Sequence, residues 1–265
     1  MDSFTLFIIV SFLASLIAAP MGCLVLWHRL SFLADTIGHA AILGVAIAML
    51  FEVNPYYGVV FISITVAVLI VRVQQRHMLL TDSILAIVSQ VGMAAGILIL
   101  ALESKHAGHV HLEDLLFGDI AELSSQHLIL LVCVALTILV VLKLSWKKLL
   151  LISMSWEISQ AEGLSVQKNR LMIYLLMALM ISALINIMGV LLIAALLIIP
   201  PTAVRWFSTS PEKMVVFTFV FVFLSMLIGL WYSFESQILS GPTIVLAAAF
   251  LLIISQITKK LLNRH

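Results

Sequence analysis

The chain has 265 residues, 63% hydrophobic and only 10% charged, with a formal net charge of +1 and a mean hydropathy of +1.21. Soluble domains carry about 25% charged residues, so this composition excludes a soluble protein and predicts one immersed in membrane lipid. The length fits about nine spans of ~20 residues, and we therefore expect a single transmembrane domain over 1–265. No basic block suggests nucleic acid as a partner.

Apolar stretches along the chain predict the spans of an all-α fold. We expect them at about 5–27, 31–51, 57–74, 82–102, 127–143, 170–187, 189–204, 214–232 and 242–258. An eight-span count is the alternative, because the pair within 170–204 is short for two crossings. The N-terminus lacks a basic region and a cleavage site, so the first span is not read as a cleaved signal peptide.

The basic residues predict the orientation of the chain. Of the 14 Lys and Arg residues, Lys105 alone falls at the opposite end of the predicted spans from the others. Because cytoplasmic loops are enriched in Lys and Arg, this pattern predicts a cytoplasmic C-terminus.

The second predicted span carries an acid and an imidazole, Asp35 and His39. Residues four apart on a helix lie on one face, so we expect both side chains to point into the same space. A carboxylate at the bilayer centre costs roughly 2.5–3.5 kcal/mol, so it indicates a pathway or a partner. The pair suits Zn²⁺ and could also serve Mn²⁺ or Fe²⁺. The alternative is a core histidine that bonds to Asp35 without a metal.

Two glycine patterns predict local geometry. Gly92 and Gly96 have the spacing that lets another helix approach closely. Gly189 ends the run Asn186-Ile-Met-Gly189, which interrupts an apolar stretch and predicts a broken helix pair.

The predicted external loop 103–126 is acidic and contains His106, His109 and His111. These histidines could sample metal weakly, or the loop could simply be a solvated polar segment.

Two predicted cytoplasmic segments are candidate docking surfaces. The segment 144–169 is amphipathic, and a turn rich in aromatic and basic residues follows Pro200-Pro201. The sequence contains no phosphate-binding G-x-x-x-x-G-K-[ST] loop, no H-E-x-x-H and no G-x-S-x-G. Together with the scarcity of intramembrane acids, this indicates a translocation path whose energy source lies on another molecule.

Several ordered motifs carry a resemblance that covers nearly the whole chain. They are the run Arg29–Ala40 with Leu43-Gly44-Val45-Ala46, then Val53-Asn54-Pro55-Tyr56-Tyr57, Leu116-Phe117-Gly118-Asp119, and the run Gly189–Arg205. The set resembles the membrane permeases of metal-ion ABC importers, the zinc- and manganese-uptake family. The stretch Arg29–Tyr57 is most similar to the zinc type, although both types share these motifs.

The resemblance implies an all-α fold of eight to nine transmembrane helices, similar to the vitamin-B12 and siderophore (type II) importer permeases. It implies a homodimer in the bacterial inner membrane, a cytoplasmic ABC ATPase dimer and an extracytoplasmic metal-binding protein. ATP hydrolysis is then expected on the separate ATPase chain. This chain would be a transport subunit and not an enzyme, with Zn²⁺ or Mn²⁺ as cargo and no permanently bound cofactor.

Carried over by position, the resemblance places Asp35 and His39 on the metal path. It assigns ATPase coupling to Arg205, Trp206, Phe207, Pro211, Glu212 and Lys213, with Glu157, Glu162 and Gly163 as a second contact. The three histidines of the external loop are outside the family pattern and receive no role from it.

Three functions are compatible with these features of the sequence. The favoured one is ATP-driven import of a divalent metal, with Zn²⁺ preferred. A secondary carrier or channel would instead move ions in vesicles that hold this chain alone. A membrane enzyme with a metal centre would keep a stoichiometric metal through purification.

Overall fold

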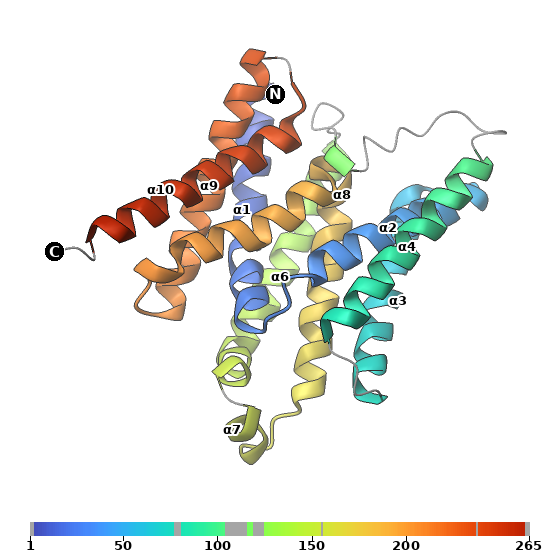
Figure 1. Ribbon diagram of the computed structural model, residues 1–265. Helices are drawn as coiled ribbons and strands as arrows, with labels where there is room; N and C mark the ends of the chain where they lie inside the picture. Colours follow the sequence, from blue (N-terminus) through green and yellow to red (C-terminus); the bar gives the residue numbers. More distant parts are fainter. Residues whose placement is uncertain are drawn as a thin grey trace.

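The computed structural model describes residues 3–76, 81–103, 116–118, 125–154, 156–236 and 238–262, and within these ranges it contains helices and no strand (Figure 1). The helices are α1 (Ser3–Trp27), α2 (Leu33–Leu50), α3 (Pro55–Arg76), α4 (Thr81–Glu103), α6 (Ser125–Met154), α7 (Trp156–Ala161), α8 (Val166–Val204), α9 (Pro211–Ser236) and α10 (Ser240–Leu262). The 3₁₀ turn η2 (Arg205–Phe207) follows α8. The expected all-α fold is confirmed.

Within the described residues, 9 helical stretches are long and apolar enough to cross a membrane. Most agree with the predicted spans, as Leu33–Leu50 does with 31–51. The exception is Ser125–Met154, which continues well past the expected end at 143. Its buried Leu142 and Leu149 lie two turns apart on one face, so the helix continues by packing that face while its lysines remain exposed.

The long helix α8 is broken at one residue, Gly189, with φ 70° and ψ 162° (Figure 1, where α8 changes direction between its yellow and orange parts). The predicted break is confirmed. Gly118, with φ 69°, lies directly against it, since a Cβ on Gly118 would come 2.6 Å from the Gly189 nitrogen. A Cβ on Gly241 of α10 would come 2.9 Å from the Phe117 carbonyl oxygen. The segment 116–118 therefore packs between the break in α8 and the start of α10.

Small residues let α2 pack closely against α3 and α4. A Cβ on Gly92 would lie 3.0 Å from Ala40 Cα, and one on Gly96 would lie 2.7 Å from the Leu43 nitrogen. The predicted close approach at these glycines is confirmed. On the other side of α2, Gly44 and Gly58 of α3 meet backbone to backbone. Between α2 and α4, the Thr36 hydroxyl donates to the Leu85 carbonyl at 3.1 Å.

One end of the bundle, which we call the basic end, gathers the end of α1, the starts of α2, α4 and α9, the end of α6 and the turn η2 around one cavity. Across this end, the indole of Trp146 on α6 donates to Glu212 Oε1 on α9 at 3.2 Å. The rings of Trp27 and Trp146 meet edge to face at 6.0 Å. The elements that meet at this end carry the exposed basic residues Arg29, Lys143, Lys147, Arg205 and Lys213.

Replacing Gly189 by Ala should destabilise the protein more than replacing Gly163 by Ala. Both glycines have positive φ, which costs a residue with a Cβ about 1–2 kcal/mol. A Cβ at Gly163 meets nothing within 4 Å, whereas one at Gly189 meets the backbone of Leu116 and Gly118. We expect Gly189→Ala to lose roughly 1–3 kcal/mol more than Gly163→Ala, measured by thermal unfolding in detergent. Equal losses would contradict the backbone contact.

Candidate functional site

Asp35 and His39 lie on one face of α2, as the sequence predicted. His39 Nδ1 is 3.3 Å from Asp35 Oδ2, one helical turn away. A carboxylate only accepts hydrogen bonds, so this contact favours the tautomer in which Nδ1 carries the proton. Nε2 then keeps its lone pair, and it forms no hydrogen bond within the described part of the chain. The imidazole is oriented and still has a free nitrogen for a ligand.

A third member of this group, Ser89 on α4, was not predicted from the sequence. Its hydroxyl lies 2.9 Å from His39 Nδ1 and is 3% exposed as a residue. Ser89 precedes Gly92 by three residues, so both occupy the face of α4 that contacts α2. That spacing was the available signal, because Gly92 already predicted which face meets another helix.

The pair is only partly covered by its own chain. The Asp35 side chain is 41% exposed and that of His39 is 20% exposed. Among the described residues, no group of three or more His, Cys, Asp or Glu side chains is arranged to hold a metal ion. The described residues of one chain therefore offer two metal donors at this pair, fewer than the four of a closed zinc site.

The turn between α8 and α9 presents an aromatic and basic surface at the basic end. Arg205, Trp206 and Phe207 are all exposed, with Trp206 at 56%. The ammonium of Lys259 on α10 lies 3.2 Å from the Trp206 ring centroid. The Ser255 hydroxyl of α10 donates to the Ala203 carbonyl at 2.7 Å, which ties α10 to the end of α8. The turn is thus exposed to solvent on one side and fixed by contacts with α10 on the other.

Beyond that turn, α9 begins at Pro211, and its first residues continue the exposed surface. Glu212 and Lys213 are both exposed, and the Ser210 hydroxyl accepts from the Lys213 amide at 3.3 Å as an N-terminal cap.

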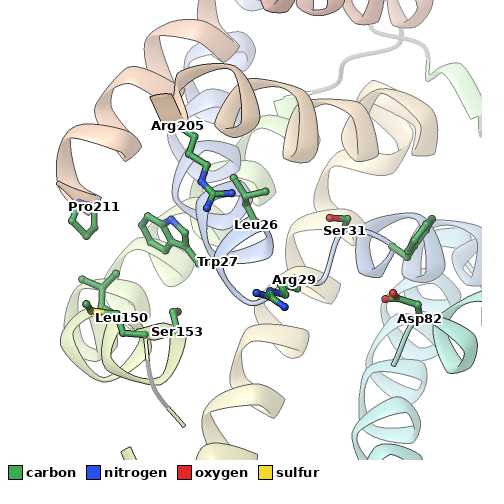
Figure 2. Close-up of a pocket in the computed structure, with 11 residues that line it drawn as sticks. Leu26, Trp27, Arg29, Ser31, Asp82, Leu150, Ser153, Arg205 and Pro211 are labelled. Carbon is green, nitrogen blue, oxygen red and sulfur yellow. The ribbon is translucent and has the colours of Figure 1, made fainter. Parts of the chain in front are cut away.

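A cavity of about 660 Å³ lies beside this turn (Figure 2). Arg29 and Arg205 both extend into it near Trp27, and neither guanidinium forms an ion pair within the described residues. Arg29 also has a positive φ of 56° at the end of α1, a position that glycine usually occupies. The amide of Leu30 donates to the Val25 carbonyl at 2.9 Å, which fixes this turn. The lining also contains one acid, Asp82, so the cavity has a net positive charge and offers two arginine donors to an acidic partner.

The second predicted contact, around α7, is also on the surface. Glu157, Glu162 and Gly163 are all exposed. Gly163 has φ 73° and ends the short helix, with its amide donating to the Gln160 carbonyl at 2.9 Å. The predicted site residues His106, His109 and His111 lie outside the described residues.

Within the described part of the chain, nine helical stretches could cross a membrane, and one of them carries an acid–imidazole pair. An ionisable pair inside a span indicates a path through the membrane, as a transport protein requires. The chain belongs to the ABC 3 transport family, which matches residues 2–259. It is a transport subunit rather than an enzyme, as the sequence predicted.

Two relatives illustrate the family. Over 247 residues the chain is 33% identical to the high-affinity zinc uptake system membrane protein ZnuB of Buchnera aphidicola subsp. Schizaphis graminum, covering 93% of this chain and 94% of that protein. It is 25% identical over 248 residues to the manganese transport system membrane protein MntC of Listeria monocytogenes, covering 94% and 88%.

Solved structures show the same fold. PsaBC from Streptococcus pneumoniae, solved with a Fab, matches with a TM-score of 0.85 at 23% identity, covering 96% of this chain and 91% of that one. An inward-facing metal-chelate type ABC transporter matches with a TM-score of 0.74 at 17% identity, covering 96% and 85%. The expected likeness to the type II importer permeases is confirmed.

His28 should make stability depend on pH. Burial and the charge of Arg170 lower the pKa of His28 from 6.5 to about 4, and its Nε2 lies 2.8 Å from the Ser153 hydroxyl. Between pH 6.5 and pH 4 the unfolded chain binds a proton that the folded chain excludes, so stability falls as the pH falls. We expect a loss of about 2 kcal/mol between pH 7.5 and pH 5 from this residue, measured by thermal unfolding. If the His28→Gln variant loses as much stability between pH 7.5 and pH 5 as the wild type does, His28 is not the source of the pH dependence.

Proposed function

We propose that this permease imports a divalent metal ion with energy from a separate ATPase, and that Zn²⁺ is its main cargo. The observation that carries the proposal is the His39–Asp35 pair, in which the carboxylate orients the ring and leaves Nε2 open. Imidazole nitrogen suits Zn²⁺, whereas Mn²⁺ favours sites richer in oxygen. The higher identity to a zinc permease than to a manganese permease supports the same cargo, with Mn²⁺ or Fe²⁺ as the alternative.

A homodimer would complete the path. An acid that is 41% exposed within a span is costly against lipid, so water or another protein surface should cover it. Two copies of the pair facing each other would supply four donors, the number of a tetrahedral zinc shell. Such a shell, shared between subunits and opened by their movement, would release its ion more readily than a closed cage.

The protein would lie in the inner membrane of a bacterium. Its basic end should face the cytoplasm, and the C-terminus would then be cytoplasmic too. The ATPase would then dock on the turn that includes Arg205, Trp206 and Phe207 and on the start of α9. Exposed aromatic and arginine side chains next to a concave surface are typical of docking sites. Glu157, Glu162 and Gly163 would form the second contact. A metal-binding protein would deliver the ion at the opposite end.

The first experiment is metal accumulation in cells starved of zinc and manganese that carry this chain, its ATPase and its binding protein. We expect zinc uptake, and we expect His39→Ala and Asp35→Ala each to reduce it at least about tenfold, because each removes a donor or its orienting partner. Ser89→Ala should have a smaller effect. The matched control is Ser225→Ala, since that buried hydroxyl donates to the Phe221 carbonyl of its own helix and to no other group in the described part of the chain.

Each outcome of this experiment separates the candidate functions. Normal uptake in both the His39 and Asp35 variants would reject the path. Uptake of manganese alone would keep the path and change the cargo. Uptake that persists without the ATPase would favour a secondary carrier.

Arg205→Glu should weaken binding of the ATPase. The substitution places a negative charge beside the cavity that we expect to receive acidic groups. We expect at least about a fivefold loss of co-purified ATPase, because a charge reversal replaces attraction with repulsion. Lys260→Glu is the control, since Lys260 is exposed on α10 outside the turn. If both variants lose the ATPase equally, the turn is not the specific contact.

A further inference from the structure

A second cavity lies between α1, α6 and α9, and it shares Glu212 with the surface proposed for the ATPase. Its volume is about 510 Å³. Its wall is made of apolar residues except at one end, where Lys143, Trp146 and Glu212 line it. We call it the α1–α6–α9 groove.

The groove runs from the basic end toward the middle of the membrane. Along α9 its lining extends from Glu212 to Phe219, and along α1 from Pro20 back to Phe12. At 1.5 Å per residue the runs are about 10–12 Å long, which is most of the ~15 Å depth of one leaflet of a ~30 Å hydrocarbon core. The deep end is closed by aromatic rings, with Phe12 and Phe219 centroids 5.5 Å apart. Phe223 stacks on Phe219 at 6.1 Å.

The polar end of the groove lies where a lipid headgroup would be. The Lys143 ammonium is exposed and forms no ion pair within the described residues. Lys147 is exposed one turn further along α6, on the same side as Lys143. Glu212 is the one acid in the lining, and it accepts the Trp146 indole N–H at 3.2 Å. The end of the groove thus combines an indole at interfacial depth with excess positive charge.

We propose that the groove binds one anionic phospholipid, with an acyl chain along its apolar wall and a phosphate near Lys143. The end of the groove has Lys143 in its lining and Lys147 one turn beyond it, against the single carboxylate of Glu212. An apolar slot of this depth with a net positive end matches a single acyl chain with an anionic head. A soluble peptide would find no polar partners along the wall. The site takes from the proposed function only that the basic end faces the cytoplasm, where anionic lipids gather.

The test uses the purified wild-type permease in mild detergent with three probes: dioleoylphosphatidylglycerol, dioleoylphosphatidylethanolamine and dioleoylphosphatidylcholine. Native mass spectrometry counts the lipids retained per chain. We expect one tightly retained phosphatidylglycerol, and a rise in unfolding temperature with this lipid that exceeds the rise with the other two. Retention does not depend on transport, so this test is separate from the uptake test.

Three variants separate the two parts of the site. Lys143→Gln should lower retention of phosphatidylglycerol about fivefold, the effect of one cation near a lipid phosphate. Val216→Trp should lower retention of all three lipids, because this 59% exposed side chain lines the groove and can be enlarged without overpacking the core. Lys260→Gln, a cation on α10 outside the groove, should retain lipid as the wild type does.

Three results would overturn the proposal. The first is equal or stronger retention of phosphatidylcholine or phosphatidylethanolamine by the wild type. The second is unchanged phosphatidylglycerol retention in Lys143→Gln. The third is disulfide cross-linking between two chains that carry Val216→Cys, because a second copy of the permease would then cover the groove.

Discussion

The close contact between α2 and α4 is the constraint on which the acid–imidazole pair depends. Gly92 and Gly96 have no side chain, so the two helices meet at backbone distance from Ala40 to Leu43. Only at that distance does Ser89 reach His39 Nδ1, while Asp35 approaches the same nitrogen from within α2. A larger side chain at either glycine would separate the helices and leave the imidazole free to rotate. The orientation of the His39 imidazole therefore depends on Gly92 and Gly96, which cannot themselves bind a ligand through a side chain.

The same packing links the pair to the basic end. Gly38, next to His39 in α2, packs against the side chain of Val190, the first residue after the break in α8. From Val190 the helix continues without interruption to Val204 and then into the turn at Arg205. That half of α8 is about 21 Å long. A displacement of the turn therefore has a direct physical route to the wall of α2 beside the pair, because a packed helix moves as one body.

Much of this arrangement could be predicted from the sequence, because hydrophobicity, helical spacing and glycine act locally. The nine spans, the shared face of Asp35 and His39, the close approach at Gly92 and the break at Gly189 follow from such rules. Ser89 was missed, since its role depends on the rotation of α4 against α2 and serines are common in membrane helices. The continuation of α6 beyond residue 143 was also missed, since the lysines there suggested a water-exposed segment while Leu149 packs in the core. The cavity lined by Arg29 and Arg205 joins residues far apart in the sequence, and no local pattern indicates it.

The break in α8 also has a consequence for the thickness of the bilayer around the protein. The half of α8 that follows Gly189 is about 21 Å long, and η2 continues it to Phe207. Because it runs at a steep angle to the half before it (Figure 1), we expect it to cover less than a ~30 Å hydrocarbon core. We therefore expect the peptide groups at Gly189, and those of Leu116 to Gly118 against it, to lie below the level of the lipid headgroups. Non-helical backbone is tolerated at that depth only where protein or water shields it. The backbone-to-backbone packing of Gly118, Gly189 and the Gly241–Phe117 contact provides that shield, and it makes these three glycines a seal between irregular peptide and hydrocarbon.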